Sequence, residues 1–159
     1  MTNRTNPSAA PKELTITRLF DAPRALVFKA WTDPKHLAQW WGPQGYTNPV
    51  CTLDVRPGGA LYIEMTGPDG IAIPNRGIFR EVVEPERLVF TTRVFEDEAG
   101  NPRLEVLNTI TFTEVGDKTR LTMHALVLIA APEVSEALGG MEQGWNESLD
   151  RLTDVLLSR

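Results

Sequence analysis

The sequence predicts an α+β domain in which a long C-terminal helix covers one face of an antiparallel sheet. Two observations carry this prediction: several segments alternate like β-strands across short turns, and the last segment has helical periodicity. Consecutive strands joined by short turns form an antiparallel meander. The expected order is one strand, two helices, six strands and one helix. The last helix is the only expected element long enough to cover the sheet.

The stretch 132–159 has the periodicity of a single amphipathic helix. Its apolar side chains recur every three or four residues and therefore share one face: Val134, Leu138, Met141, Trp145, Leu149, Leu152 and Leu156. Pro132 suits the first turn, because the N–H that it lacks would be unpaired there. Gly139, Gly140 and Gly144 lie inside the pattern, although glycine costs roughly 1 kcal/mol relative to alanine in a helix. We therefore expect a helix that crosses the sheet closely or borders an unfilled space such as a ligand cavity.

Two short helices are expected after the first strand. Asp21 is expected to cap a helix that begins near Pro23. Asp33 and Pro34 predict a second helix, as its N-cap and its first residue. That helix should stop at Gly42, which is followed by proline.

The remaining segments alternate between apolar and polar residues or are closed by turn residues. The expected strands are 13–20, 50–55, 61–65, 76–83, 87–95, 104–113 and 119–129. Gly58 and Gly59 read as a turn, not a phosphate loop, because no helix follows them. The segment Gly67-Pro68-Asp69-Gly70 is a strong hairpin signal.

Composition indicates one ordinary globular domain. We expect a disordered leader over 1–12 and a single domain over 13–159, in a chain of 159 residues with 42% hydrophobic residues. A net charge of -5 argues against nucleic-acid binding and against docking on anionic membranes. No apolar run has the length of a membrane span, and one cysteine allows no intramolecular disulfide. These features favour a cytoplasmic location.

Few side chains are suited to metal binding or nucleophilic catalysis. The chain has two histidines, His36 and His124, and one cysteine, Cys51, without close ligand spacing, so neither a metal nor a cofactor is expected. Alternation favours an outer-face position for His124, with a pocket acid or base as the alternative. Cys51 is expected to be a small buried hydrophobe.

Aromatic side chains are the main candidates for a ligand-binding cavity, with ordinary core packing as the alternative for each. They are Trp40, Trp41, Tyr62, Phe79, Phe90, Phe112 and Trp145, and Met141 joins them one turn before Trp145. Trp40 and Trp41 point about 100° apart on a helix, so one should pack inward and the other should meet the cavity mouth.

Polar groups in such a cavity would orient a ligand. The candidates are Glu64, Arg76, Arg93 and Asn108. Asn108 shares a face with apolar neighbours, so its amide must bond to backbone or face a ligand or water. Glu64 and Arg76 lie on neighbouring strands, and a surface ion pair is the alternative for them.

Several local segments, in the same order, resemble the SRPBCC or START-like superfamily, and more narrowly the domain named after the activator of 90-kDa heat-shock protein ATPase. They include Phe20-Asp21-Ala22-Pro23, Trp40-Trp41-Gly42-Pro43, Arg56-Pro57-Gly58-Gly59, the hairpin from Met65 to Gly70, the run from Glu81 to Phe90, and Gly144-Trp145 with Leu149-Asp150-Arg151-Leu152. The resemblance spans about 13–157. It implies a helix-grip fold, a curved antiparallel sheet wrapped on a C-terminal helix with a cavity between them.

Three functions are compatible with this fold, since fold alone does not determine function. The first is binding of a small hydrophobic or amphipathic molecule in the cavity. The second is a cyclase, dehydratase or hydrolase, which would need an acid–base pair such as Glu64 with Arg76 or His124. The third is a co-chaperone-like interaction module. A heat-shock protein partner is not expected, because the short leader has no room for the extra domain of the eukaryotic co-chaperone, and a homodimer through sheet edges remains open.

Overall fold

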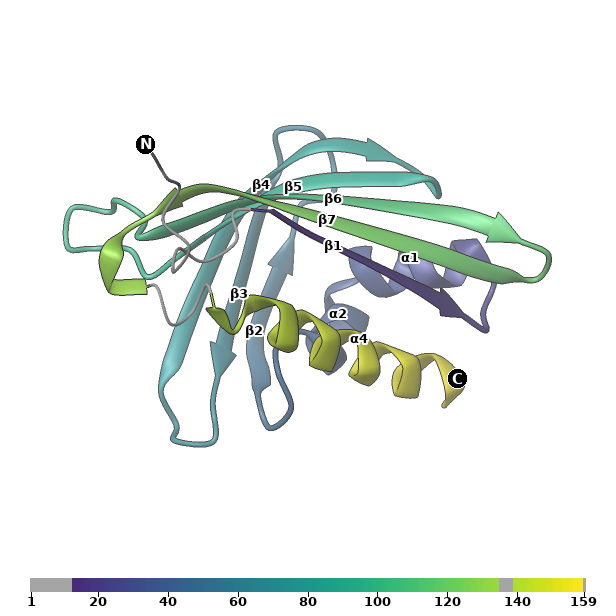
Figure 1. The fold of residues 1–159 in the computed structure, drawn as a ribbon, viewed down its shortest axis with the longest axis horizontal. Helices are drawn as coiled ribbons and strands as arrows, with labels where there is room; N and C mark the ends of the chain where they lie inside the picture. The colour runs from purple at the N-terminus through teal and green to yellow at the C-terminus, as the bar shows by residue number, and fades with distance from the viewer. Residues whose placement is uncertain (1–12, 135–138, 159) are drawn as a thin grey trace, which may run out of the picture.

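The computed structural model describes residues 13–134 and 139–158 and shows a curved antiparallel sheet with helices on its concave side (Figure 1). The strands are β1 (Glu13–Phe20), β2 (Thr47–Leu53), β3 (Ala60–Thr66), β4 (Ala72–Val83), β5 (Arg87–Val94), β6 (Leu104–Val115) and β7 (Lys118–Ala130). Their order across the sheet is β1-β7-β6-β5-β4-β3-β2, so β1 and β2 form the two edges. All seven predicted strands are confirmed, and β1 has the predicted bounds. The expected leader over 1–12 lies outside the described residues.

The C-terminal segment differs from the single helix expected over 132–159. The structure has a short 3-10 helix η1 (Pro132–Val134) and then the helix α4 (Met141–Leu157), and the predicted helical residues 135–138 and 159 lie outside the description. Gly140 is the N-cap of α4, so of the three glycines only Gly144 lies inside that helix. Adjacent glycines disfavour helix continuation, because their backbone loses the most entropy on ordering.

Helices α1 (Arg24–Thr32) and α2 (Pro34–Trp40) lie between β1 and β2 in the chain. The N-cap of α1 is Pro23, without a side-chain hydrogen bond, so the predicted cap at Asp21 was wrong. The N-cap of α2 is Asp33, whose carboxylate accepts from the Lys35 amide at 3.0 Å, as predicted.

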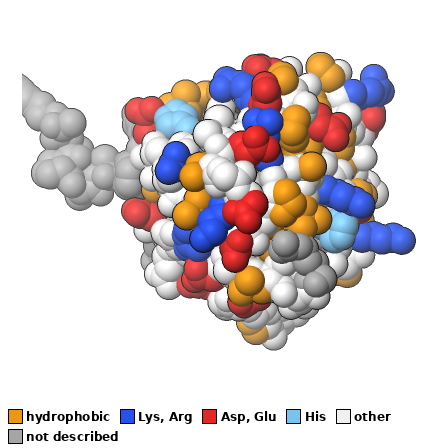
Figure 2. Space-filling view, turned by 90° about the vertical axis from the view of Figure 1, so that its right-hand side faces the viewer, with side chains coloured by type: hydrophobic (Ala, Val, Ile, Leu, Met, Phe, Trp, Pro, Cys, Tyr) orange, Lys and Arg blue, Asp and Glu red, His pale blue; other side chains and the backbone are white. Residues whose placement is uncertain are grey.

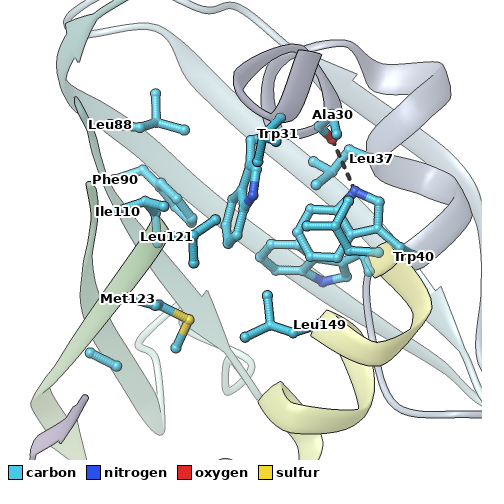
Figure 3. Close-up of a cluster of buried hydrophobic side chains, with 14 of the residues drawn as sticks. Ala30, Trp31, Leu37, Trp40, Leu88, Phe90, Ile110, Leu121, Met123 and Leu149 are labelled. Atoms are coloured by element: carbon cyan, nitrogen blue, oxygen red, sulfur yellow. Dashed lines mark hydrogen bonds between the residues drawn. The ribbon is translucent and has the colours of Figure 1, made fainter. Parts of the chain in front are cut away.

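The core lies between the concave face of the sheet and the described helices α1, α2 and α4 (Figure 3). Alternate residues of β6 are buried, which follows from the two-residue period of a strand. Trp31 and Trp40 pack edge to face with ring centroids 4.6 Å apart. The indole of Trp40 donates to the Ala30 carbonyl at 3.0 Å, so this fully buried ring keeps a hydrogen-bond partner.

Arg18 of the edge strand β1 binds helix α4. Arg18 donates to the Asn146 carbonyl and side-chain oxygen, each at 3.1 Å, and pairs with Asp150 at 2.9 Å. Leu149 and Leu152 are fully buried on the face of α4 that the periodicity predicted. These contacts hold the helix across the sheet.

The face shown in Figure 2 carries acidic and basic side chains side by side, with small hydrophobic areas between them. Within the described ranges, no helix has both the length and the apolar character needed to cross a membrane.

Candidate functional site

A cavity of about 330 Å³ lies where the N-terminal half of α4 faces the sheet. Helix α4 and the loop after α2 form one side of it. Their lining residues are Trp41, Gly42, Pro43 and Tyr46 from the loop, and Met141, Gly144, Trp145 and Ser148 from the helix. Gly144, the glycine inside α4, therefore borders an unfilled space, as the sequence suggested.

Four adjacent strands form the other side of the cavity. They contribute Met65 from β3, Ile73 and Asn75 from β4, Thr92 and Val94 from β5, and Leu104, Val106 and Asn108 from β6. Most of these side chains are apolar, and the polar ones are neutral.

The position of Trp145 is set by two other tryptophans. Its ring stacks on that of Trp31, with centroids 6.0 Å apart and an interplanar angle of 14°. Trp41 meets it edge to face at 5.2 Å. Aromatic pairs at such distances add about 0.5–1.5 kcal/mol beyond burial. The cavity therefore has a flat aromatic surface anchored in the core.

Arg151 of α4 binds the loop that lines the cavity. One guanidinium nitrogen donates to the carbonyls of Trp41, Gly42 and Pro43 at 3.1, 2.9 and 3.1 Å, and the other donates to Gln39 at 3.1 Å. Burial lowers the pKa of Arg151. A cation suits this place, because the last carbonyls of a helix are unpaired and carry partial negative charge. Sequence reasoning missed this role, and the only signal was Arg151 within the segment Leu149-Asp150-Arg151-Leu152.

Asn108 is the polar group in the cavity wall with an unmet hydrogen-bonding requirement. It is 1% exposed, and its Nδ2 donates to the Phe90 carbonyl, the Thr92 hydroxyl and the Val106 carbonyl. Its Oδ1 has no partner among the described residues. The sequence left two possibilities for the Asn108 amide: bonds to the backbone, or contact with a ligand or water. The bonds to backbone carbonyls are present, but they satisfy only the amide nitrogen.

Four of the eleven predicted site residues line the cavity: Trp41, Asn108, Met141 and Trp145. Trp40, Phe79, Phe90 and Phe112 lie instead in the packed core, each at most 1% exposed. Of the two consecutive tryptophans, Trp40 thus packs inward and Trp41 faces the loop and cavity. The division arises because α1 and α2 fill one part of the concave face and leave the other part open.

Tyr62, Glu64 and Arg76 lie on the opposite face of the sheet. Leu61 and Ile63 of β3 point inward, so the alternate residues Tyr62 and Glu64 point outward. Tyr62 donates to Glu64 at 2.9 Å, which raises the pKa of Tyr62, and the Arg76 guanidinium lies 4.7 Å from the Tyr62 ring centre. Arg76 pairs with Glu96 at 3.0 Å, and no Glu64–Arg76 ion pair forms among the described contacts.

The described lining contains one titratable side chain, Tyr46. His124 lies outside it, with Nε2 2.7 Å from Glu13 of β1, which confirms the outer-face interpretation. Within the described ranges, no group of three or more His, Cys, Asp or Glu side chains is placed to hold a metal ion.

Cys51 of β2 is half-buried and packs against the core. Burial raises the pKa of its thiol to about 11, and the Asp33 carboxylate adds to this effect. The thiol is therefore protonated near neutral pH.

We expect iodoacetamide to alkylate Cys51 slowly near pH 7, because only the thiolate reacts. The rate should rise about tenfold per pH unit up to about pH 10 without levelling off. Mass spectrometry of timed samples measures it. In urea-unfolded protein the same rate should level off near the ordinary thiol value of 9.0. If the alkylation rate of the folded protein also levels off near pH 9.0, burial does not raise the pKa of the Cys51 thiol.

Comparison with known proteins gives the same fold over the same segments. The family described as Activator of Hsp90 ATPase homolog 1-like protein matches residues 21–157. No significant match was found among curated proteins.

Solved structures from several bacteria are similar over nearly the whole chain. A Mycobacterium smegmatis protein is 30% identical with a TM-score of 0.75, covering 91% of this chain and 90% of that one. An Arthrobacter aurescens protein is 28% identical with a TM-score of 0.80, covering 93% and 87%. A Nitrosomonas europaea protein is 26% identical with a TM-score of 0.75, covering 97% of both chains. Because the family match spans 21–157, this chain belongs to the family of Activator of Hsp90 ATPase homolog 1-like proteins, with the helix-grip fold of that group.

Proposed function

We propose that this protein binds a small hydrophobic or amphipathic molecule in the cavity between α4 and the sheet. The observation that carries the proposal is the cavity itself, about 330 Å³ in volume and lined mainly by apolar side chains. Small-molecule sites have volumes of about 300–1,000 Å³ and combine apolar walls with a few polar groups. Trp41 and Trp145 offer an aromatic surface, and Asn108 supplies a buried polar group.

The described lining has no charged side chain, which favours binding over acid–base catalysis. Hydrolase or dehydratase chemistry needs a positioned acid and base near the substrate. Tyr46 is the one titratable side chain of the described lining, and Glu64, Arg76 and His124 lie away from the cavity. The enzymatic alternative therefore has no specific observation in its favour.

Filling the cavity should weaken ligand binding. We expect Val106→Phe to weaken binding of Nile red, a neutral apolar dye, at least about tenfold, because Val106 is buried in the cavity wall and a phenyl ring there occupies the space. Titration of dye fluorescence measures the affinity. The matched control is Leu107→Phe, one residue along β6 and on the opposite face. Equal dye binding by wild type and Val106→Phe would place the dye elsewhere and count against the proposal.

Native mass spectrometry of freshly purified protein complements the dye titration. A small-molecule mass that appears only under native conditions, and is lost in Val106→Phe, would support an occupied cavity. Persistence of that mass in the filled variant would contradict it.

The other expectations stay predictions. They are a cytoplasmic location and the absence of a nucleic-acid partner, a membrane partner and a cofactor. Whether the protein forms a homodimer is a separate question for native mass spectrometry. The family name refers to a heat-shock protein ATPase, and we expect no stimulation of that ATPase by this chain. A pull-down and an ATPase assay would measure it.

A further inference from the structure

The sheet wall of the cavity carries a short polar stripe across three neighbouring strands. Asn75 on β4, Thr92 on β5 and Asn108 on β6 are 5%, 7% and 1% exposed, and all three line the cavity. Thr92 and Asn108 are linked, because Asn108 Nδ2 donates to Thr92 Oγ1 at 3.2 Å. The other lining residues of these strands are apolar.

The neighbours of Asn108 determine which of its two polar atoms is free. Its Nδ2 lies 3.3 Å from the Phe90 carbonyl oxygen and 3.4 Å from that of Val106, and a carbonyl can only accept. Reversing the amide would place oxygen against both of these oxygens. The unpartnered atom is therefore the acceptor Oδ1. A buried acceptor without a donor costs about 1–3 kcal/mol.

Two of the other polar side chains around the cavity use a donor within the protein. Asn75 Nδ2 donates to the Ile73 carbonyl at 3.0 Å, and the Ser148 hydroxyl donates to the Gly144 carbonyl at 3.1 Å. The Ser148 oxygen keeps its lone pairs free to accept. The unused capacity of Asn108 and Ser148 is thus for accepting hydrogen bonds.

The described lining contains no Lys, Arg, His, Asp or Glu. A buried carboxylate or ammonium group would therefore lie there without an opposite charge, which is costly. On the basis of the proposed binding function, we infer that the ligand is a neutral molecule with a hydroxyl or similar donor for Asn108 Oδ1, an atom covered in the free protein that the ligand must uncover. Its apolar part lies against Trp41 and Trp145. Carboxylates such as fatty acids are poor ligands, and an analogue without the donor binds less tightly than its donor counterpart.

Three probes that share one ring system test this inference on the wild-type full chain. They are 1-naphthol, which is a neutral donor near pH 7, 1-methoxynaphthalene, which lacks the donor, and 1-naphthoate, which is an anion. Displacement of Nile red ranks their affinities. We expect 1-naphthol to displace the dye about tenfold better than 1-methoxynaphthalene, equivalent to about 1.4 kcal/mol. We expect 1-naphthoate to be the weakest of the three.

The variant Asn108→Leu tests whether Asn108 causes the preference for 1-naphthol over 1-methoxynaphthalene. Leucine has a similar shape and no acceptor, so the ratio between the affinities of 1-naphthol and 1-methoxynaphthalene should fall to within about twofold. Thr109→Val is the matched control, one residue along β6 on the outer face, and should keep the wild-type ratio.

The outcomes separate the two proposals. If the dye binds but 1-methoxynaphthalene or 1-naphthoate has the same affinity as 1-naphthol, the inference about the ligand is wrong. The proposed binding in the cavity is then still supported. Absence of binding by the dye and all three probes overturns the proposed function and the inference with it. The wild-type ranking decides between these outcomes even if Asn108→Leu fails to fold.

Discussion

Replacing Gly77 with alanine is expected to destabilise the protein by about 3 kcal/mol, the upper end of the usual cost of overpacking, because the backbone itself would have to shift. A Cβ at Gly77 would overlap the carbonyl oxygen and carbon of Thr91 on β5. The ladder is irregular here, since the Ile78 amide donates to the Thr91 hydroxyl at 3.2 Å. Backbone atoms cannot rotate away as a flexible side chain can. Urea unfolding followed by circular dichroism measures the loss.

Gly144→Ala is the matched control for Gly77→Ala. Its Cβ would meet only the Pro43 side chain, at an ordinary 3.7 Å. Alanine in a helix interior is favoured over glycine by about 1 kcal/mol, so this variant should be slightly more stable than wild type. Equal stability of Gly77→Ala and wild type would show that the close approach of β4 and β5 is not required.

Replacing Arg151 with methionine is expected to cost about 2–4 kcal/mol, because hydrogen bonds from charged donors are worth more than neutral ones. The change leaves the carbonyls of Gln39, Trp41, Gly42 and Pro43 without this donor. Three of these residues line the cavity, so Nile red affinity should fall as well. Urea unfolding and the dye titration measure the two effects.

Two further variants test the Arg151 prediction. Arg151→Lys keeps the charge, but one ammonium group cannot reproduce the planar fork, so we expect an intermediate loss. Arg120→Met makes the same substitution at an exposed position of β7 and should change stability by less than about 0.5 kcal/mol. A loss for Arg151→Met no greater than that for Arg120→Met would show that the carbonyl clamp is not needed.

Most elements of the fold were predictable because their signals are local. Alternation in β1 and the Asp33-Pro34 start of α2 depend on residues a few positions apart, and both predictions match the structure. The start of α4 was misplaced because the apolar spacing continues through Gly140, which is the N-cap of α4 and lies outside the helix. The outward direction of Tyr62 was available from the same alternation, given that Leu61 and Ile63 are the buried residues of β3.

The cavity lining was only partly predictable, because burial in a core and exposure to a cavity require the same apolar residues. Phe90 and Phe112 contact Trp31 of α1, with ring centroids 6.3 and 6.4 Å away, and are sealed by it. Val106, on the same inward face as Phe112, lines the cavity, whose described lining includes no residue of α1. No local pattern distinguishes these positions.

By itself, the sequence determined the order of strands and helices, the buried faces of the elements and an unusual buried amide at Asn108, because these depend on periodicity and residue chemistry. The tertiary structure alone decided where the concave face stays unfilled, which atom of Asn108 is unpartnered, and which carbonyls Arg151 holds. These features join residues far apart in the chain, 18 positions for Asn108 and Phe90 and 110 for Arg151 and Trp41. Their geometry arises only when the sheet curves around α4 and brings those segments together.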